Sequence, residues 1–158
     1  MPEPMTGTAW KVVPFAGLTT LELHDLLRLR VDIFVVEQRC AYAEIDGQDP
    51  QALHLLGQDA AGQLIAYARI LPPGQDGKPH IGRVVVREDH RGCGLGRALM
   101  EHAIAACTRM HGALPIVVQA QSALQGLYAS LGFAPISTEY LWDGIPHVDM
   151  ERAGNTGF

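Results

Sequence analysis

The chain has 158 residues, of which 47% are hydrophobic and 18% charged, and these values are typical of one globular domain with its own core. Its 12 basic and 17 acidic side chains give a formal charge of -5, the wrong sign for binding nucleic-acid backbones by broad electrostatics. We expect no export and no membrane partner, because the sequence shows neither a signal-peptide pattern nor a long apolar run. The three cysteines lack the spacing of a disulfide framework or of zinc ligands, so we expect reduced thiols in a cytoplasm.

The first half of the chain predicts one helix, a loop and a hairpin. After a short apolar piece at residues 10–15, Thr19-Thr20-Leu21-Glu22 fits a capping box, and apolar residues near helical spacing extend the helix to Phe34. Polar and turn-forming residues predict a loop over residues 37–50. Strand-like runs at Leu53 to Gln58 and Leu64 to Leu71, separated by a loop that contains glycine, predict a hairpin.

The second half alternates strands and helices. The near-continuous apolar run from His80 to Val86 predicts a strand covered on both faces. The elements expected after it are a helix over residues 97–111, a buried strand over 115–120, a short helix over 122–131 closed by Gly132, and a hairpin of residues 135–142 and 147–151 that turns at Asp143-Gly144. Without repeats or a linker, residues 1–158 are expected to form a single domain, with 1–9 and 153–158 loose.

A glycine-rich loop between a strand and a helix is the clearest functional pattern. Ile81-Gly82-Arg83-Val84-Val85-Val86 leads into Arg91-Gly92-Cys93-Gly94-Leu95-Gly96, followed by Arg97. Glycines let backbone N–H groups converge at the positive end of a helix, which is a favourable place for a phosphate. The spacing matches neither a dinucleotide nor a nucleoside-triphosphate loop, and a plain connecting turn is the alternative.

This loop resembles the [QR]-x-x-G-x-[GA] signature of the GNAT family of N-acetyltransferases. Downstream, Ala120-Gln121 at a strand end and Tyr128-Ala129-Ser130-Leu131-Gly132-Phe133 resemble the second motif of that family, in the right order. Segments that resemble the ElaA-like branch extend the similarity over nearly the whole chain: Phe34-Val35-Val36-Glu37-Gln38, Ile45-Asp46-Gly47, Gly82-Arg83-Val84 and Asp143-Gly144-Ile145-Pro146-His147.

The resemblance implies an α/β (α+β) fold with one mixed sheet of about seven strands, flanked by helices and splayed between the fourth and fifth strands. It implies acetyl-coenzyme A as cosubstrate, with the pantetheine arm on the backbone of Val84, Val85 and Val86. The pyrophosphate would lie on Arg91, Gly92, Cys93, Gly94, Leu95, Gly96 and Arg97. Where the family often has Asn after the fifth strand, this chain has Gln121-Ser122, so the cofactor contact of Gln121 is less well supported by the resemblance.

Acyl transfer to an amine needs a base for the amine and an acid for the departing thiolate. The resemblance favours Tyr128 as the acid; packing is the alternative, since Leu124, Tyr128 and Leu131 share a helical face. Glu37 is the first candidate for the base, with an ordinary solvated carboxylate as the alternative. No metal-ligand spacing is present among the histidines.

Residues 37–59 carry an excess of carboxylates that could attract a cationic acceptor or could simply face water. His54 and His147 are either polar residues of an acceptor pocket or structural histidines. Cys93 could be a reactive thiol or a small residue that fills the loop.

The function expected from sequence is therefore transfer of an acetyl group from acetyl-coenzyme A to a primary amine of unknown identity. A sensor that binds acyl-coenzyme A without turnover is the main alternative, and a hydrolase is disfavoured because no G-x-S-x-G or Ser-His-Asp pattern is present. The oligomeric state is open, with a homodimer as one option.

Overall fold

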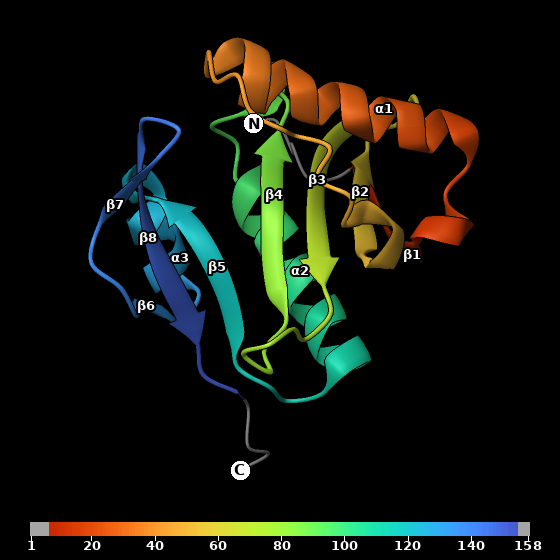
Figure 1. Ribbon diagram of the computed structural model, residues 1–158. Helices are drawn as coiled ribbons and strands as arrows, with labels where there is room; N and C mark the ends of the chain where they lie inside the picture. The colour runs from red at the N-terminus through yellow and green to blue at the C-terminus, as the bar shows by residue number, and fades with distance from the viewer. Residues whose placement is uncertain (1–6, 155–158) are drawn as a thin grey trace.

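The computed structural model describes residues 7–154, and its centre is one mixed β-sheet. The strands are β1 (Ala9–Pro14), β2 (Leu53–Gln58), β3 (Leu64–Leu71), β4 (His80–Val86), β5 (Ile116–Gln121), β6 (Phe133–Pro135), β7 (Tyr140–Trp142) and β8 (Ile145–Arg152). The eight strands lie in the order β1-β2-β3-β4-β5-β8-β6, with β7 paired to β8 (Figure 1). Only β4 and β5 pair in parallel.

The sheet opens between β4 and β5. These strands pair only at His80↔Val117 and Ile81↔Val118, and beyond Ile81 they diverge (Figure 1). A bulge in β4 accompanies the divergence: Arg83 has a φ of 50°, and two residues, Arg83 and Val84, face Ala68 alone on β3. The bulge turns Val85 towards α1 (Thr20–Arg30), whereas Ile81 packs on the opposite face of the sheet. The splayed mixed sheet predicted from the sequence is thus confirmed.

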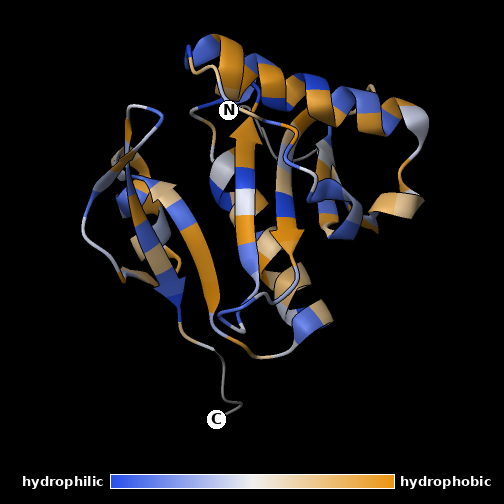
Figure 2. Ribbon diagram, in the orientation of Figure 1, coloured by the Kyte–Doolittle hydropathy of each residue, from blue (hydrophilic) through white to orange (hydrophobic). Residues whose placement is uncertain are grey.

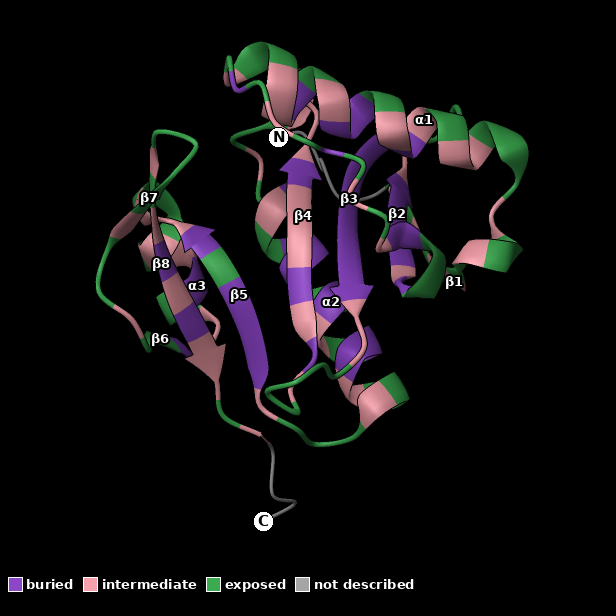
Figure 3. Cartoon of the chain, in the orientation of Figure 1, coloured by how far each residue is buried: buried purple, intermediate pink, exposed green. Residues whose placement is uncertain are grey.

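Helices cover both faces of the sheet. α1 lies on one face, and α2 (Leu95–His111) and α3 (Gln125–Ser130) lie on the other (Figure 1). Alternate residues of β3 show the division, because Ala66 and Ala68 pack with α2 while Tyr67 packs with α1. The apolar residues of strands and helices pack in these two layers. Hydrophobic and hydrophilic residues alternate along α1 (Figure 2), and β3 in the middle of the sheet is buried over nearly its whole length (Figure 3).

Local sequence signals explain where several elements begin and end. The capping box at the start of α1 is present as predicted: Thr19 accepts from the backbone N–H of Glu22, whose side chain accepts from the backbone N–H of Thr19. Asp143 and Gly144 have φ values of 51° and 79° and form the turn between β7 and β8, which confirms that hairpin. Gly132, with a φ of 95°, follows the end of α3.

Four expectations about elements need correction. The α-helical part of the first helix ends at Arg30, and Val31–Glu37 forms a π-helix. β4 is not covered on both faces, because Val84 and Val86 border the opening beside β5 and remain partly exposed.

The first arm of the final hairpin is shorter than predicted, since residues 136–139 are not strand. Ala9 belongs to β1, and Gly154 packs against Ala113, so only residues 1–6 and 155–158 of the expected loose ends lie outside the described range.

Within residues 7–154, no helix is both long and apolar enough to cross a membrane.

Candidate functional site

A cavity of about 780 Å³ lies where β4 and β5 diverge. Its walls come from both halves of the sheet, from the loop before α2, from α3 and from the hairpin β7–β8. Predicted site residues that line it are Glu37, Val84, Val85, Val86, Arg91, Gly92, Gly94, Leu95, Gly96, Gln121 and Tyr128. Cys93 and Arg97, the other two, do not line it. The opening of the sheet therefore brings together residues from distant parts of the sequence.

The glycine loop, Arg91 to Gly96, lines the cavity through all its residues except Cys93. Gly92 and Gly94 have φ values of 80° and 84°, which residues with a Cβ rarely adopt. Gly94 is the N-cap of α2 and provides no side-chain cap, so the first N–H groups of the helix are open to a ligand. A helix N-terminus with free N–H groups and a positive dipole end can hold a phosphate.

The two arginines that flank this loop differ in their surroundings. Arg91 donates through Nε to the carbonyl of Val86 at 3.0 Å and through its two terminal nitrogens to Glu37 at 2.8 and 3.2 Å. Arg97 donates to Ser130 Oγ at 2.7 Å. The thiol of Cys93 donates to the carbonyl of His90 at 3.1 Å, so Cys93 serves the loop structure on the side away from the cavity.

Glu37 lies at the end of the π-helix and lines the cavity. Its bidentate ion pair with Arg91 joins the π-helix to the glycine loop. Each carboxylate oxygen accepts one hydrogen bond from Arg91 and keeps a further lone pair, so the ion pair holds Glu37 against the glycine loop.

Tyr128 of α3 lies at the cavity wall and is only 4% exposed. Its ring meets Phe133 edge to face, with centroids 5.8 Å apart. Burial raises the pKa of Tyr128 to about 12, so the phenol keeps its proton at neutral pH and can donate a hydrogen bond. Packing and proton donation are thus compatible at this residue.

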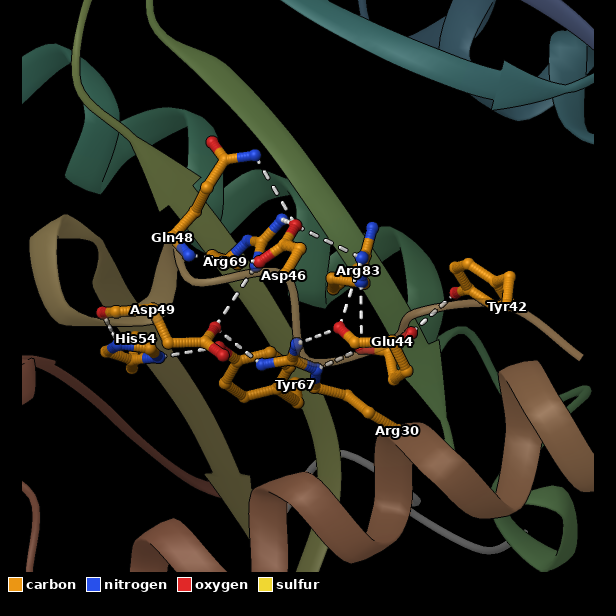
Figure 4. Close-up of polar contacts among 10 residues, drawn as sticks. All are labelled: Arg30, Tyr42, Glu44, Asp46, Gln48, Asp49, His54, Tyr67, Arg69 and Arg83. Atoms are coloured by element: carbon orange, nitrogen blue, oxygen red, sulfur yellow. Dashed lines mark hydrogen bonds and ion pairs between the residues drawn. The ribbon is translucent and has the colours of Figure 1, made fainter. Parts of the chain in front are cut away.

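Three of the five acids in residues 37–59, which were predicted to face the acceptor or the solvent, belong to an ionic cluster in which Glu44 and Asp49 are buried and Asp46 lines the cavity. The arginine–carboxylate cluster consists of Arg30, Glu44, Asp46, Asp49, Arg69 and Arg83 (Figure 4). Glu44 accepts from Arg30 at 2.6 Å and from Arg83 at 2.8 Å, and Asp49 accepts from Arg30 at 2.7 Å. Three arginines offset three carboxylates, so the expected negative patch is absent from this cluster.

The cluster shifts the titration of its acids. Burial alone would raise the pKa of Asp46, but hydrogen bonds from Arg69 and from the backbone of Gln48 outweigh it and lower that pKa to about 2. For Asp49, burial also opposes ionisation, and the hydrogen bond and charge of Arg30 prevail to lower its pKa. Both carboxylates are therefore ionised at neutral pH.

His54 does not line the cavity, which corrects one of its two predicted roles. The ring is completely buried and both nitrogens are bonded, Nδ1 with the Tyr67 hydroxyl at 2.6 Å and Nε2 with the carbonyl of Asp49 at 2.9 Å. His54 thus supports the arginine–carboxylate cluster. His147, by contrast, lines the cavity.

The sequence reasoning did not identify Tyr42, Arg69 and Arg83 as cavity residues. A signal for Arg69 was available, since it is one charged residue in an otherwise apolar strand, where a buried charge requires a partner. Arg83 is placed by the bulge, and Tyr42 by hydrogen bonding to Glu44, and neither feature follows from periodicity.

Known proteins resemble this chain over most of its length. A family model described as "Acetyltransferase (GNAT) domain" matches residues 28–153. A UPF0039 protein of Schizosaccharomyces pombe is 44% identical over 137 residues, which cover 86% of this chain and 91% of that protein. Protein ElaA of Escherichia coli is 42% identical over 146 residues, covering 90% and 95% of the two chains.

Solved structures agree with these sequence relatives. A structure described as an acyl-CoA N-acyltransferase from Pseudomonas aeruginosa superposes with a TM-score of 0.88 at 44% identity, covering 92% of this chain and 99% of that chain. The crystal structure of Escherichia coli ElaA gives a TM-score of 0.86 at 40% identity with the same coverage.

Proposed function

Since the chain belongs to the GNAT acetyltransferase family, we propose that it transfers an acetyl group from acetyl-coenzyme A to a primary amine by direct attack in a ternary complex. One observation carries the proposal: the glycine loop at the start of α2 and the unpaired edge of β4 border the same cavity. A phosphate site at the glycine loop and free backbone groups along the wall suit a long phosphorylated thioester such as acetyl-coenzyme A.

The cofactor would lie along β4. Val84 and Val86 would offer backbone groups to the pantetheine arm where β5 has diverged, and the glycine loop would hold the pyrophosphate. Arg91, the first residue of the loop, lines the cavity and could meet the phosphates, whereas Arg97 does not line it and would contribute at longer range. Gln121 lines the cavity from the end of β5, a position from which its amide could contact the cofactor.

For proton transfers, we assign Tyr128 as the acid that protonates the departing thiolate. Its place on the cavity wall and its retained proton support this role. Glu37 remains a candidate for the base, either through a lone pair that Arg91 does not use or after Arg91 has turned from it to the pyrophosphate of bound coenzyme.

The choice of a primary amine as acceptor rests on the family, because the arginine–carboxylate cluster is internally neutral and gives no net attraction for cations.

The three cysteines, Cys40, Cys93 and Cys107, are unpaired, and these free thiols support a cytoplasmic location as part of the same proposal.

The proposal is tested by thiol release from acetyl-coenzyme A in the presence of an alkylamine, lysine, spermidine and a peptide with a free N-terminus. Release that depends on one of these amines, with the acetylated product seen by mass spectrometry, is the expected result. Tight binding of acetyl-coenzyme A without release for any amine would instead favour the sensor function.

The location of the cofactor is tested separately by calorimetry on Gly94→Val. A Cβ at Gly94 would meet open space, but its φ of 84° is strained for a branched residue, so the loop must rearrange and lose its anion geometry. We expect acetyl-coenzyme A affinity to fall at least about tenfold, equivalent to about 1.4 kcal/mol. Gly77→Val is the matched control, because Gly77 also has a positive φ of 73° and open space but lies outside the cavity lining. Equal affinity of wild type and Gly94→Val would remove the glycine loop from the binding site.

A further inference from the structure

His147 lies on β8 at the wall of the cavity. It pairs with Gln121, the last residue of β5, and thus sits beside the point where β5 has separated from β4. Its neighbour Val148 is 5% exposed and packs in the core with α2, so the alternation of a strand directs His147 to the other face of the sheet. The rings of Tyr140 and Trp142 hold the imidazole, at centroid distances of 6.0 and 5.6 Å.

A hydrogen bond fixes the tautomer of this imidazole. Nδ1 lies 2.7 Å from the backbone carbonyl oxygen of Ile145. A carbonyl oxygen only accepts, so Nδ1 must carry the proton and donate it. In the neutral ring Nε2 then holds a lone pair, and among residues 7–154 it has no hydrogen-bond partner.

The other histidine that lines the cavity is differently placed. Nε2 of His80 is 2.7 Å from the carboxylate of Asp76, so it is already engaged. Glu37, the carboxylate considered above, is engaged by Arg91. His147 therefore offers the cavity a proton acceptor that no neighbouring group has to release first.

We propose that His147 is the catalytic residue that takes the proton from the attacking amine; the inference rests on the acetyl-transfer function proposed above. The amine nitrogen attacks the thioester carbon and forms the C–N bond, which makes its N–H more acidic, and Nε2 of His147 accepts that proton. The C–S bond then breaks, and the thiolate leaves with a proton from Tyr128. The amide, free thiol, imidazolium and tyrosinate that result are balanced when His147 returns its proton to solvent and Tyr128 recovers one.

The arrangement of the two groups suits this division of labour. Tyr128 belongs to the core layer that includes α2, whereas His147 faces the side of α1, and both border the same cavity. A thioester lying in the opening between β4 and β5 would meet the acid on one face of the sheet and the base on the other. The amine would then approach from the α1 side.

The pH behaviour of His147 depends on the charged and titratable groups near it. Asp149 is two residues away on β8 and accepts a hydrogen bond from the Tyr140 hydroxyl of β7, and Asp143 lies in the turn between these strands. The facing residues of β5, Gln119 and Gln121, are uncharged. Charged and titratable groups that line the same cavity from other elements are Glu37, Cys40, Tyr42, Asp46, Arg69, His80, Arg83, Arg91 and Tyr128.

The test is the pH dependence of kcat at saturating concentrations of acetyl-coenzyme A and of the most reactive amine of the panel, measured by thiol release, because kcat reports groups of the bound complex and not the titration of the free amine. In wild type kcat should rise with pH as the base of the bound complex loses its proton. His147→Asn keeps an amide that can donate to Ile145 but has no ring Nε2. We expect it to lose this rise and about 10²- to 10⁴-fold in kcat, while calorimetry shows acetyl-coenzyme A binding within about threefold of wild type. His147→Gln should behave similarly.

Two further variants make the result specific. His24→Asn removes an exposed histidine of α1 and should leave rate and pH profile unchanged. Glu37→Gln should keep the rise with pH. The inference is overturned if His147→Asn and His147→Gln bind acetyl-coenzyme A and retain both the rise and a near wild-type rate, or if Glu37→Gln abolishes the rise instead. Absence of amine-dependent release in wild type would be a failure of the proposed function itself, and the inference would fall with it.

Discussion

At the scale of single residues, Tyr128 combines two demands in one side chain. Its ring is part of the core against Phe133, and its hydroxyl lies at the cavity wall with a pKa raised to about 12 by burial. A phenol in this state does not ionise at neutral pH. It can hydrogen-bond to the sulfur as negative charge develops there, which is the time when that bond is strongest.

Tyr128→Phe separates the two demands, because it removes the hydroxyl and keeps the ring. We expect kcat to fall about 10²- to 10⁴-fold, or roughly 2.7 to 5.5 kcal/mol of barrier, with acetyl-coenzyme A affinity preserved. The residual rate should depend more steeply on the pKa of the leaving thiol, measured with a series of acetyl thioesters of the coenzyme and its analogues. A variant with near wild-type kcat, in conditions where chemistry limits the rate, would assign Tyr128 to packing alone.

Some residues of the site can be predicted from sequence motifs, whereas the properties of others depend on contacts that form only in the folded protein. The glycine loop with Gly92 and Gly94 is visible as a local pattern, and Tyr128 was assigned from the family motif; all three line the cavity. The free nitrogen of His147 depends on the carbonyl of Ile145 and on the rings of Tyr140 and Trp142, which adopt that arrangement only when β7 and β8 pair. Sequence alone therefore left His147 with two interpretations.

At the scale of elements, the arginine–carboxylate cluster joins α1, the loop after the π-helix, and strands β3 and β4. Arg30 of α1 is completely buried, Arg69 of β3 is 3% exposed, and Glu44 of the loop is 4% exposed. The carboxylates of the loop are thus the anchors that fasten it to the sheet (Figure 4).

We expect Glu44→Gln to lower the free energy of unfolding by about 1 to 3 kcal/mol, since it removes one of the two charged partners of both Arg30 and Arg83. Chemical denaturation measures this. Glu101→Gln is the matched control, because Glu101 is an exposed partner of Arg97 at 3.8 Å and such surface pairs contribute about 0 to 1 kcal/mol. Similar small losses in both variants would show that the cluster does not anchor the loop.

The cluster also predicts the response to acid. The pKa of Asp46 is lowered from 3.8 to about 2 in the folded protein, so its contribution to stability is complete above the unfolded pKa and is lost as pH falls from about 4 to 2. At about 1.36 kcal/mol per unit, the loss is roughly 2 kcal/mol. Asp46→Asn should therefore flatten the acid limb of stability in denaturant titrations between about pH 5 and pH 2. If the stability of Asp46→Asn fell with decreasing pH as steeply as that of wild type, other carboxylates would be responsible for the loss of stability in acid.

Sequence reasoning predicted most of the elements but not this cluster. Strand and helix positions follow from apolar periodicity and from glycine and capping signals, all of which are local. The cluster pairs residues far apart in the chain, such as Arg30 with Asp49 and Arg69 with Asp46. In the sequence the carboxylates form a charged run, whereas their arginine partners lie elsewhere in the chain, within α1, β3 and β4. No local pattern predicts which arginine pairs with which carboxylate.

At the scale of the whole molecule, the sheet consists of two parts joined at one narrow place. Strands β1 to β4 form one part and β5 to β8 the other, and two residue pairs connect them in the sheet (Figure 1). A ligand that fills the cavity contacts both parts. Its binding free energy then also stabilises the junction between them.

Acetyl-coenzyme A at about 100 times its dissociation constant should raise the free energy of unfolding by about 2.7 kcal/mol. Hydrogen exchange should localise the effect, with the largest gain in protection along the diverging ends of β4 and β5, in residues 84–86 and 119–121, and in the glycine loop. Strand β1, which is remote from the cavity, serves as the internal reference. Protection that rises only in β1 to β3 would place the cofactor elsewhere.

The narrow junction between β4 and β5 also bears on how the chain folds. The pairs β2–β3, β3–β4 and β7–β8 close short loops, whereas the junction closes only after residues 87–115, including α2, have crossed from one strand to the next. The entropy lost in closing a loop grows with its length, so these three pairs should form before the junction. Because few strand pairs hold the junction, mutations there should mainly raise the unfolding rate and leave the folding rate nearly unchanged.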